Sequence, residues 1–397
     1  MTTLLCQTDA RRTQVTTRVL SCAPTEGGFA VVPAETVLYP EGGGQPSDAG
    51  WLDGQPVLEL RRRDDGGVEH VVAAAVEGEV TVELDWARRF DLMQQHSAQH
   101  LITAVALARL GLPTIAFHLG PERSDVEFDA PAIAPDALAT LEAAVNEVVR
   151  EARAVRVHHV TREEAAKLPV RSRRLPEGLE GMLRLVEIDG LDLNTCGGTH
   201  VANTAELQAV KLLGTEKLSR GTRVFYLAGG RVLAALGAAE QKDRELTRLT
   251  SAGPTEHLRV LAKLQADLKD AEKARRALAG ELAEALGAAL AAQGPVAALH
   301  RDDGSMELAR TIANAARKAN PDLLLLLTGG TTDGFFLLAG PEAKVAALGP
   351  RVAEVLGGKG GGGRGMYQGK AGELGRRNQA VALLGHDGPT SFESRTS

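Results

Sequence analysis

Hydrophobic and polar residues alternate over the first 85 residues, which is the pattern of half-buried strands. β-branched residues occur in short runs such as "VTVEL", and glycine, proline and aspartate separate these runs. Asp53-Gly54 and "DDGG" at 64–67 are turn signals of the kind that join β-hairpins. Residues 1–85 are therefore predicted to form a small antiparallel β-barrel, with a sandwich as the alternative.

The hydrophobic period changes at residue 86 from that of a strand to that of a helix. Asp85 is a candidate N-cap, apolar residues then recur at helical spacing as far as Ala108, and Gly111 and Pro113 end the run. Further strand patterns and a second helix over 135–152 follow. The pattern predicts an α+β domain over 86–232.

A charged segment over 233–292 has the pattern of an amphipathic helix or helical hairpin, with Gly253-Pro254 as the break. Its leucine stripe is interrupted at Ala271 and Arg275, which argues against a long regular coiled coil. Strand and helix patterns return over 293–388 and predict a small α/β domain. Residues 389–397 are predicted to be a tail, and the fold class of the whole chain is α+β.

Composition excludes several classes of protein. No apolar run reaches the ~18 residues of a membrane span, and the first residues lack the apolar core of a signal peptide, so no membrane association is expected. Three cysteines without a framework pattern indicate a reducing, cytoplasmic setting. The formal net charge of −6 means that a nucleic-acid partner would have to be held by local basic patches.

Two pairs of residues have the chemistry of metal ligands. His96 and His100 are four residues apart on the predicted helix, and Cys196 and His200 have the same offset in a glycine-rich loop. Either pair alone also fits an ordinary buried residue, but together they form a Cys/His3 set that suits Zn²⁺. The sequence therefore predicts one zinc ion per chain. A protease of the H-E-x-x-H class is excluded because Ser97 follows the first histidine.

With both pairs in view, "HSAQH" and "CGGTH" resemble the two zinc motifs of the alanyl-tRNA synthetase editing domain and of the free-standing alanyl-tRNA editing proteins of the AlaX type. "YPEGGGQPSDAGWL" resembles the glycine motif of their N-terminal barrel, and "GGKGGGGRGMYQGKAG" resembles the signature of the DHHA1 domain in the long forms. The resemblance covers nearly the whole chain. No Asp-His-His motif is present, so a DHH-family phosphodiesterase is excluded.

The resemblance implies a trans-editing hydrolase that deacylates mischarged tRNA(Ala), with Ser-tRNA(Ala) as the first expected substrate and Gly-tRNA(Ala) as the second. The chain begins at the barrel, so no aminoacylation domain is expected ahead of it. Phe117-His118 stand in the region where the synthetases carry a glutamine, and the amino-acid selectivity is therefore not carried over.

The glycine motif and the strand after the first helix supply candidate substrate-binding residues. Gly43 and Gly44 form a permissive loop in this interpretation, and Gln45 offers its amide to the substrate, although a tight barrel turn explains the glycines equally well. His118 is a candidate pocket residue, with a hydrogen-bonded core histidine as the alternative.

The C-terminal segment is locally basic, with five basic residues against Glu373 alone between 356 and 380. The candidate tRNA-binding residues there are Lys359, Arg364, Lys370, Arg376 and Arg377, and the glycines at 360–363 expose backbone N–H groups to phosphates. Arg171, Arg173 and Arg174 form a second basic patch. A solvated face is the alternative for both. The resemblance also implies a homodimer through this domain, a role that competes with tRNA binding.

Two other functions remain open at this point. One is a tRNA-binding or dimerisation module whose zinc is purely structural, since four protein ligands are typical of structural sites. The other is a zinc hydrolase that acts on a small-molecule ester or amide. Zinc-dependent ester hydrolysis would distinguish an editing enzyme from the binding module. Dependence of the hydrolysis on tRNA would distinguish it from the small-molecule hydrolase.

Overall fold

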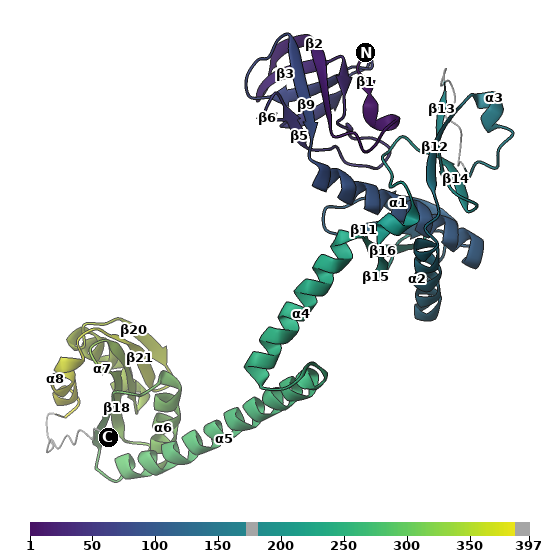
Figure 1. The fold of residues 1–397 in the computed structure, drawn as a ribbon. Coiled ribbons are helices and arrows are strands. Elements are labelled where there is room, and N and C mark those ends of the chain that lie inside the picture. Colours follow the sequence, from purple (N-terminus) through teal and green to yellow (C-terminus); the bar gives the residue numbers. More distant parts are fainter. Residues whose placement is uncertain (172–181, 386–397) are drawn as a thin grey trace. The chain divides into compact units, whose positions relative to one another are not determined.

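The computed structural model describes residues 1–171 and 182–385, and the chain has a mixed α+β fold with several sheets, as predicted (Figure 1). It divides into two compact units, Met1–Glu245 and Leu246–Ser397. The finer division into four domains stays a prediction. Arg173, Arg174 and the predicted tail at 389–397 lie outside the described residues.

An antiparallel sheet of seven strands, in the order β6-β5-β9-β2-β3-β8-β7, forms the N-terminal part of the first unit. Its strands are β2 (Gln14–Thr25), β3 (Gly28–Pro33), β5 (Gly50–Leu52), β6 (Gln55–Pro56), β7 (Glu59–Arg62), β8 (Val68–Val72) and β9 (Glu79–Leu84). The long β2 pairs with β9 over Gln14–Arg18 and with β3 from Val19 onward, with a register shift between Val19 and Ser21 in the β3 pairing. Because the strand order is linear, the sheet is a half-barrel with edges at β6 and β7 and not a closed barrel.

Helix α1 (Trp86–Leu110) follows the half-barrel and carries the first histidine pair. Asp85 accepts a hydrogen bond from the backbone N–H of Arg88 at 3.1 Å, and Gly111 ends the helix with φ of 63°, so both predicted ends are confirmed. Short elements precede it: the parallel pair β1 (Thr3–Leu4) and β4 (Glu35–Thr36), and the 3₁₀ turn η1 (Leu5–Gln7).

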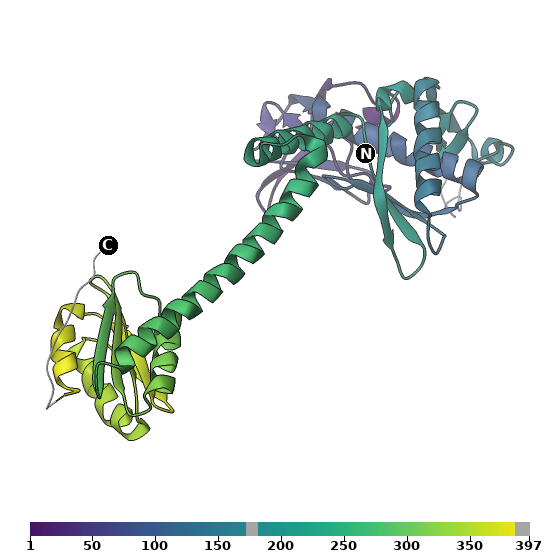
Figure 2. The same ribbon diagram turned by 90° about the horizontal axis from the view of Figure 1, so that it is seen from below.

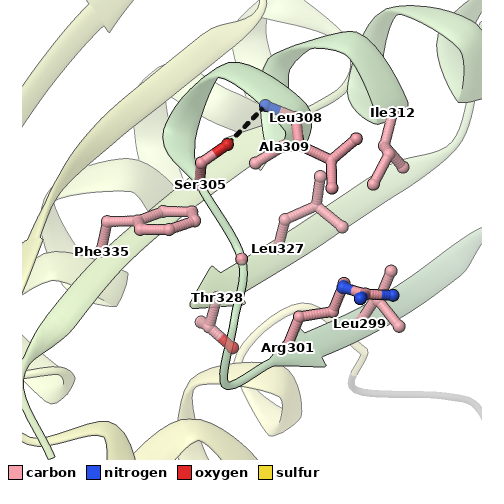
Figure 3. A pocket seen from close by; sticks show the side chains of 10 residues that line it. Leu299, Arg301, Ser305, Leu308, Ala309, Ile312, Leu327, Thr328 and Phe335 are labelled. Carbon is pink, nitrogen blue, oxygen red and sulfur yellow. Dashed lines mark hydrogen bonds between the residues drawn. The ribbon is translucent and has the colours of Figure 1, made fainter. Parts of the chain in front are cut away.

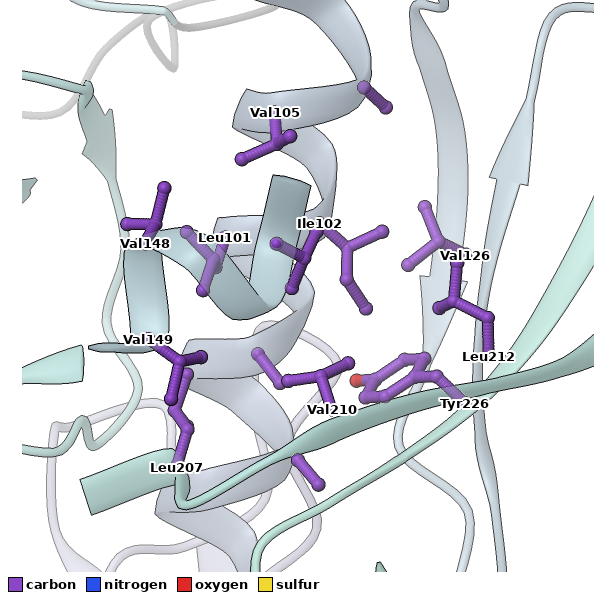
Figure 4. Close-up of a cluster of buried hydrophobic side chains, with 14 of the residues drawn as sticks. Leu101, Ile102, Val105, Val126, Val148, Val149, Leu207, Val210, Leu212 and Tyr226 are labelled. Atoms are coloured by element: carbon purple, nitrogen blue, oxygen red, sulfur yellow. The ribbon is translucent and has the colours of Figure 1, made fainter. Parts of the chain in front are cut away.

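A second antiparallel sheet, β10-β11-β16-β15, packs with α1 and α2 (Pro135–Arg150) around one apolar core. Its strands are β10 (Thr114–His118), β11 (Ser124–Phe128), β15 (Val210–Lys217) and β16 (Thr222–Ala228). Figure 4 shows side chains of α1, α2 and the sheet in contact, among them Leu101, Val148 and Val126. This core holds α1 rigidly, which fixes the histidines that it carries.

The second metal motif comes from a smaller sheet. β12 (Val155–Val160), β13 (Leu183–Ile188) and β14 (Asp192–Thr195) pair antiparallel in that order, with α3 (Arg162–Ala165) between the first two along the chain. Cys196 directly follows β14, and η2 (Thr204–Leu207) comes shortly after His200. α4 (Gly230–Thr250) leaves the first unit.

The second unit contains a five-stranded sheet in the order β17-β18-β19-β21-β20, in which only β17 and β18 run parallel. Its strands are β17 (Val296–Arg301), β18 (Leu324–Gly330), β19 (Gly334–Ala339), β20 (Gly360–Gly363) and β21 (Met366–Ala371). Its helical elements are η3 (Pro254–Glu256), α5 (His257–Ala291), α6 (Met306–Ala319), α7 (Glu342–Val355), η4 (Leu374–Arg376) and α8 (Arg377–Ala382). The break predicted at Gly253-Pro254 separates α4 from α5.

Apolar clusters cover both faces of this sheet. One contains residues of α5 and α6, which lie side by side (Figure 2), and the other contains residues of α7 and α8. A small pocket lies where β17 and β18 end, beside the first turn of α6 (Figure 3). Its polar groups already have partners: Ser305 caps α6 at Leu308 N, and Arg301 pairs with Asp303. We therefore interpret this pocket as part of the packing of the hydrophobic core.

Within the ranges described, no helix combines the length and the apolar character that a membrane span needs.

Candidate metal centre and cavity

The structure brings the two predicted pairs together. His96 and His100 project from one face of α1, Cys196 and His200 come from the loop after β14, and one ligand atom from each lies within 4.8 Å of all the others. The Nε2 atoms of His96 and His200 lie 3.5 Å and 3.2 Å from Cys196 Sγ. The two pairs are about 100 positions apart in the sequence, and together their four side chains can hold a metal ion.

Two of the histidine rings are oriented by buried hydrogen bonds. His96 Nδ1 lies 2.8 Å from Gln45 Oε1, an acceptor, so Nδ1 carries the proton and Nε2 is free to bind a metal. Ser97 Oγ lies 3.1 Å from His200 Nδ1 and accepts from the backbone N–H of Val201, so the hydroxyl holds the second ring in place. Both rings therefore present Nε2 to Cys196.

Gln45 has its whole amide engaged inside the protein. Oε1 accepts from Thr199 N at 2.9 Å as well as from His96, and Nε2 donates to Thr199 Oγ1 at 2.9 Å. The side chain is buried. Gln45 therefore lies behind His96, a candidate metal ligand, and is not among the residues that line the cavity beside it. Gly198 is required in this packing, since a Cβ there would lie 2.3 Å from His96 Cε1 and 2.7 Å from Gln45 Oε1.

The third ring, that of His100, has a carboxylate nearby. His100 Nδ1 is buried and has no hydrogen-bond partner among the described residues, and Asp192 Oδ2 lies 3.9 Å from it. Arg171 holds Asp192 through two contacts of 2.7 Å. A carboxylate behind a ligating histidine commonly fixes its tautomer, so Asp192 is the candidate orienting group for His100.

Burial sets the protonation of the site. It lowers the pKa of His96 and His200 well below the usual value and that of His100 to about 3, so all three imidazoles are neutral, as metal ligands must be. Burial raises the pKa of the Cys196 thiol, while the N–H of Gly198 and the charge of Arg184 act in the opposite direction. A borderline-soft cation supplies the charge that favours the thiolate, and the donor set fits Zn²⁺.

Arg184 is the nearby cation that sequence reasoning missed. Its side chain donates to Cys196 O at 2.6 Å and to Gln7 O at 3.1 Å, which ties the cysteine loop to the N-terminal strand region. Burial lowers its pKa, and the attraction of Cys196 partly reverses this. Nothing in the local sequence around Arg184 marks this role.

A cavity of about 310 Å³ adjoins the metal ligands. Residues that line it are Gly43, His96, Gln99, His100, Thr103, Thr114, Ala116, Phe117, Arg171, Asn194, Thr195, Cys196 and Gly197. No carboxylate stands among these lining residues, so none of the described acidic side chains lines the cavity as a general base.

The glycine motif is a tight turn that also borders the cavity. Gly43 and Gly44 have φ of 59° and 82°, and backbone bonds of 3.1 Å join Gly42 and Gln45 in both directions, as in a two-residue hairpin turn. A Cβ on Gly44 would lie 2.8 Å from the Phe117 ring. The tight-turn interpretation is confirmed, and the turn delivers Gln45 to His96. Gly43 lines the cavity, and its role in substrate binding stays a prediction.

His118 is not among the residues lining the cavity. Its side chain is 58% exposed and its Nδ1 lies 3.0 Å from Asp125 Oδ1, so it is neither a cavity residue nor a core histidine. His118, Asp125 and Glu127 form a second group of potential ligands, but Arg223 already pairs with both carboxylates. Phe117, the preceding residue, is the one that reaches the cavity.

The basic residues predicted in the C-terminal segment lie on and after the β20–β21 hairpin. Lys359, Arg364 and Lys370 are exposed, Arg376 pairs with Glu373 at 2.6 Å, and Arg377 is half-buried. The glycines 360–363 form an edge strand and not a loop, which leaves alternate backbone N–H groups without a neighbouring strand. Arg171 of the second predicted patch is engaged by Asp192.

The candidate metal centre lies partly in a segment similar to a domain of aminoacyl-tRNA synthetases. Residues 183–226 match the family described as "Threonyl and Alanyl tRNA synthetase second additional domain". This match contains Cys196 and His200, half of the candidate ligand set.

Relatives extend the similarity to nearly the whole chain. It is 41% identical over 401 residues to the alanyl-tRNA editing protein Aarsd1 of Mus musculus, covering 96% of this chain and 97% of that protein. It is 40% identical to Aarsd1-A of Xenopus laevis, with 96% of each covered. AlaX-M of Methanosarcina mazei is 30% identical over 228 residues, covering 51% of this chain and 88% of that protein. The chain belongs to the alanyl-tRNA editing protein family, which confirms the resemblance seen in the sequence.

Proposed function

We propose that this chain is a zinc-dependent hydrolase that removes a wrong amino acid from tRNA(Ala), with Ser-tRNA(Ala) as the main substrate and Gly-tRNA(Ala) as the second. The observation that carries the proposal is the convergence of His96, His100, Cys196 and His200 beside a 310 Å³ cavity. Membership of the alanyl-tRNA editing protein family supports the substrate class.

The need for such an activity follows from the size of alanine. An aminoacylation site shaped for alanine cannot strongly exclude glycine, because glycine is smaller. It rejects the added hydroxyl of serine by only about 10²-fold, judging from comparable apolar pockets. Serine and glycine are therefore the expected errors. A separate site that hydrolyses the wrong ester corrects them.

The chain's own side chains orient the candidate metal ligands and form the walls of the cavity. Gln45, Ser97 and Asp192 hold or flank the three histidine rings, and the Gly43–Gly44 turn with Phe117 closes one wall of the cavity. Zinc, when bound, supplies a Lewis acid that can polarise the ester carbonyl or position the α-amino group or the terminal ribose. The described residues that line the cavity include no carboxylate, so none of them supplies an acidic side chain as the proton acceptor for the hydrolytic water.

The test is a deacylation time course on one tRNA(Ala) preparation charged separately with serine, glycine and alanine. We expect rapid loss of serine, slower loss of glycine and sparing of alanine. The variant Cys196→Ala should lose at least about 100-fold in rate, because even groups behind a metal ligand are worth 10- to 100-fold. The matched control is Cys22→Ala, which should keep full activity. Cys22 is a half-buried cysteine of β2, far from Cys196 in the sequence.

Undiminished activity in Cys196→Ala would overturn the assignment of the zinc site. A second function, a binding module with a purely structural zinc, is favoured by one observation: four protein ligands form a closed set. It predicts one zinc per chain and no hydrolysis above the spontaneous rate with any of the three amino acids.

A further inference from the structure

The polar stripe on α1 extends beyond the two histidines. His96, Gln99, His100 and Thr103 are spaced i, i+3, i+4 and i+7, so they share one face of the helix, and all four line the cavity. Apolar residues would be expected at such buried positions. Gln99 is 5% exposed and Thr103 is 2% exposed, so two uncharged polar side chains are buried here. Gln99 lies between the two histidines along the helix, and Thr103 lies about one helical turn beyond His100.

The side chains of Gln99 and Thr103 form one hydrogen-bonded cluster with a third residue that lines the cavity, Thr114. Gln99 Nε2 donates to Thr103 Oγ1 at 2.9 Å, and Thr114 Oγ1 of β10 donates to the same oxygen at 3.0 Å. Thr103 Oγ1 thus accepts two hydrogen bonds, which uses both of its lone pairs. Among the described residues, none accepts the Thr103 hydroxyl hydrogen and none donates to Gln99 Oε1.

Within the described part of the chain, the Thr103 hydroxyl and Gln99 Oε1 are thus left with one free hydrogen-bond donor and one free acceptor. This pair is the complement of an alcohol, which accepts one hydrogen bond and donates another. An apolar ligand would leave both unsatisfied, at a cost in affinity, since a buried polar group without a partner is unfavourable. The cluster therefore selects for a hydroxyl group at this end of the cavity.

We propose that Thr103 and Gln99, with Thr114 holding Thr103 in place, bind the side-chain hydroxyl of the seryl group and make serine the preferred substrate. This inference rests on the proposed function, because it assigns the substrate selectivity of the same site. Thr103 donates to the hydroxyl oxygen, and Gln99 Oε1 accepts its hydrogen.

The terminal ribose of the tRNA also carries hydroxyls, but the depth of the cluster favours the amino-acid side chain. Arg171, with 27% of its side chain exposed, and Gly197, which is exposed, lie on the more accessible part of the lining. The nucleotide has to stay where the rest of the tRNA can leave the cavity.

The first experiment uses the unmodified protein. Its kcat/KM is measured on tRNA(Ala) charged with serine, with glycine and with 2-aminobutyrate, in which a methyl group replaces the serine hydroxyl at nearly the same size. We expect serine to exceed 2-aminobutyrate by about tenfold or more, the ratio that corresponds to ~1.4 kcal/mol, within the usual cost of an unsatisfied buried group. Equal rates for these two substrates would overturn the proposal.

The second experiment changes the protein. Thr103→Val keeps the shape and removes the hydroxyl, so serine deacylation should fall about tenfold while glycine deacylation changes less than about twofold. Thr103→Ser should restore the serine preference. Zinc content, measured in each variant, should remain at the wild-type value.

A uniform loss on serine and glycine in Thr103→Val would show a structural role and overturn the inference. If the wild-type protein deacylates none of the substrates, the proposed function itself fails, and this outcome is distinguishable from a lost serine preference in an active enzyme.

Discussion

Single side chains orient the metal ligands from distant parts of the chain. Gln45 reaches His96 from a turn of the half-barrel, 51 positions away, and Ser97 reaches His200, 103 positions away. Gln45 Oε1 can only accept from Nδ1 of His96, which keeps Nε2 of that ring free for a metal. The amide that the sequence suggested for the substrate thus contacts a candidate metal ligand, and the residues that line the cavity are Gly43 and Phe117.

His70 gives a prediction about pH at the same scale. It is buried in the half-barrel, where Thr36 Oγ1 lies 2.8 Å from its Nε2 and Val68 O lies 3.2 Å from its Nδ1, and burial lowers its pKa to about 4. Between pH 4 and the ordinary pKa of 6.5, the unfolded chain therefore binds a proton that the folded chain does not. Stability should fall as the pH drops through this window, by roughly 3 kcal/mol from this residue.

The measurement is chemical denaturation of wild type and His70→Gln at pH 7 and at pH 4. The variant should lose less stability than the wild type over this interval, because its amide does not titrate. Parallel curves for the two proteins, with the same loss on acidification, would show that His70 does not contribute to the acid sensitivity.

At the scale of elements, a buried ion pair joins α1 to the half-barrel. Both side chains of Arg89 and Asp48 are fully buried, Arg89 Nε contacts Asp48 Oδ1 at 3.0 Å, and the guanidinium also donates to Ala10 O and Val37 O. Arg89→Met would leave the Asp48 carboxylate buried without its cation. We expect a loss of about 3–5 kcal/mol in the free energy of unfolding, read from denaturant midpoints.

The adjacent Arg88 is the matched control, since it lies on the same helix, is exposed, and contacts only Ser47 O on the half-barrel side. Arg88→Met should cost less than about 1 kcal/mol. A similar small loss in both variants would mean that the buried pair is not what couples α1 to the half-barrel.

Elements with strong local signals were predictable from the sequence, and contacts between elements were not. The ends of α1 at Asp85 and Gly111 follow from capping chemistry that acts within four residues. The cluster of the four candidate metal ligands was predictable because cysteine and histidine are scarce and recur at one spacing. Asp192 and Arg184 carry no such mark, since common charged residues acquire these roles only when β13 and β14 are placed against α1. The glycine run at 360–363 gives no local strand signal because glycine weakens strands, yet its pairing with β21 makes it a strand.

At the scale of the whole molecule, the metal ligands and the C-terminal basic residues belong to different units. Lys359 and Lys370 stand opposite each other, with Lys370 N donating to Lys359 O at 3.2 Å. Two like charges facing each other on neighbouring strands are unfavourable unless an anion lies between or above them. This arrangement supports contact with the phosphate backbone of tRNA, in a chain whose net charge of −6 gives no general attraction.

The double variant Lys359→Gln/Lys370→Gln tests this role against dimerisation. We expect a higher KM for charged tRNA, an unchanged kcat, and a salt dependence of binding whose logarithmic slope is smaller by roughly 1 to 2, because about one counterion is released for each phosphate contact. Lys263→Gln/Lys269→Gln removes the same charge from exposed positions of α5 and should change neither quantity. If instead the first double variant shifts a dimer to a monomer in sedimentation while its salt slope stays that of wild type, the hairpin lysines serve an interface between copies and the tRNA must be held elsewhere.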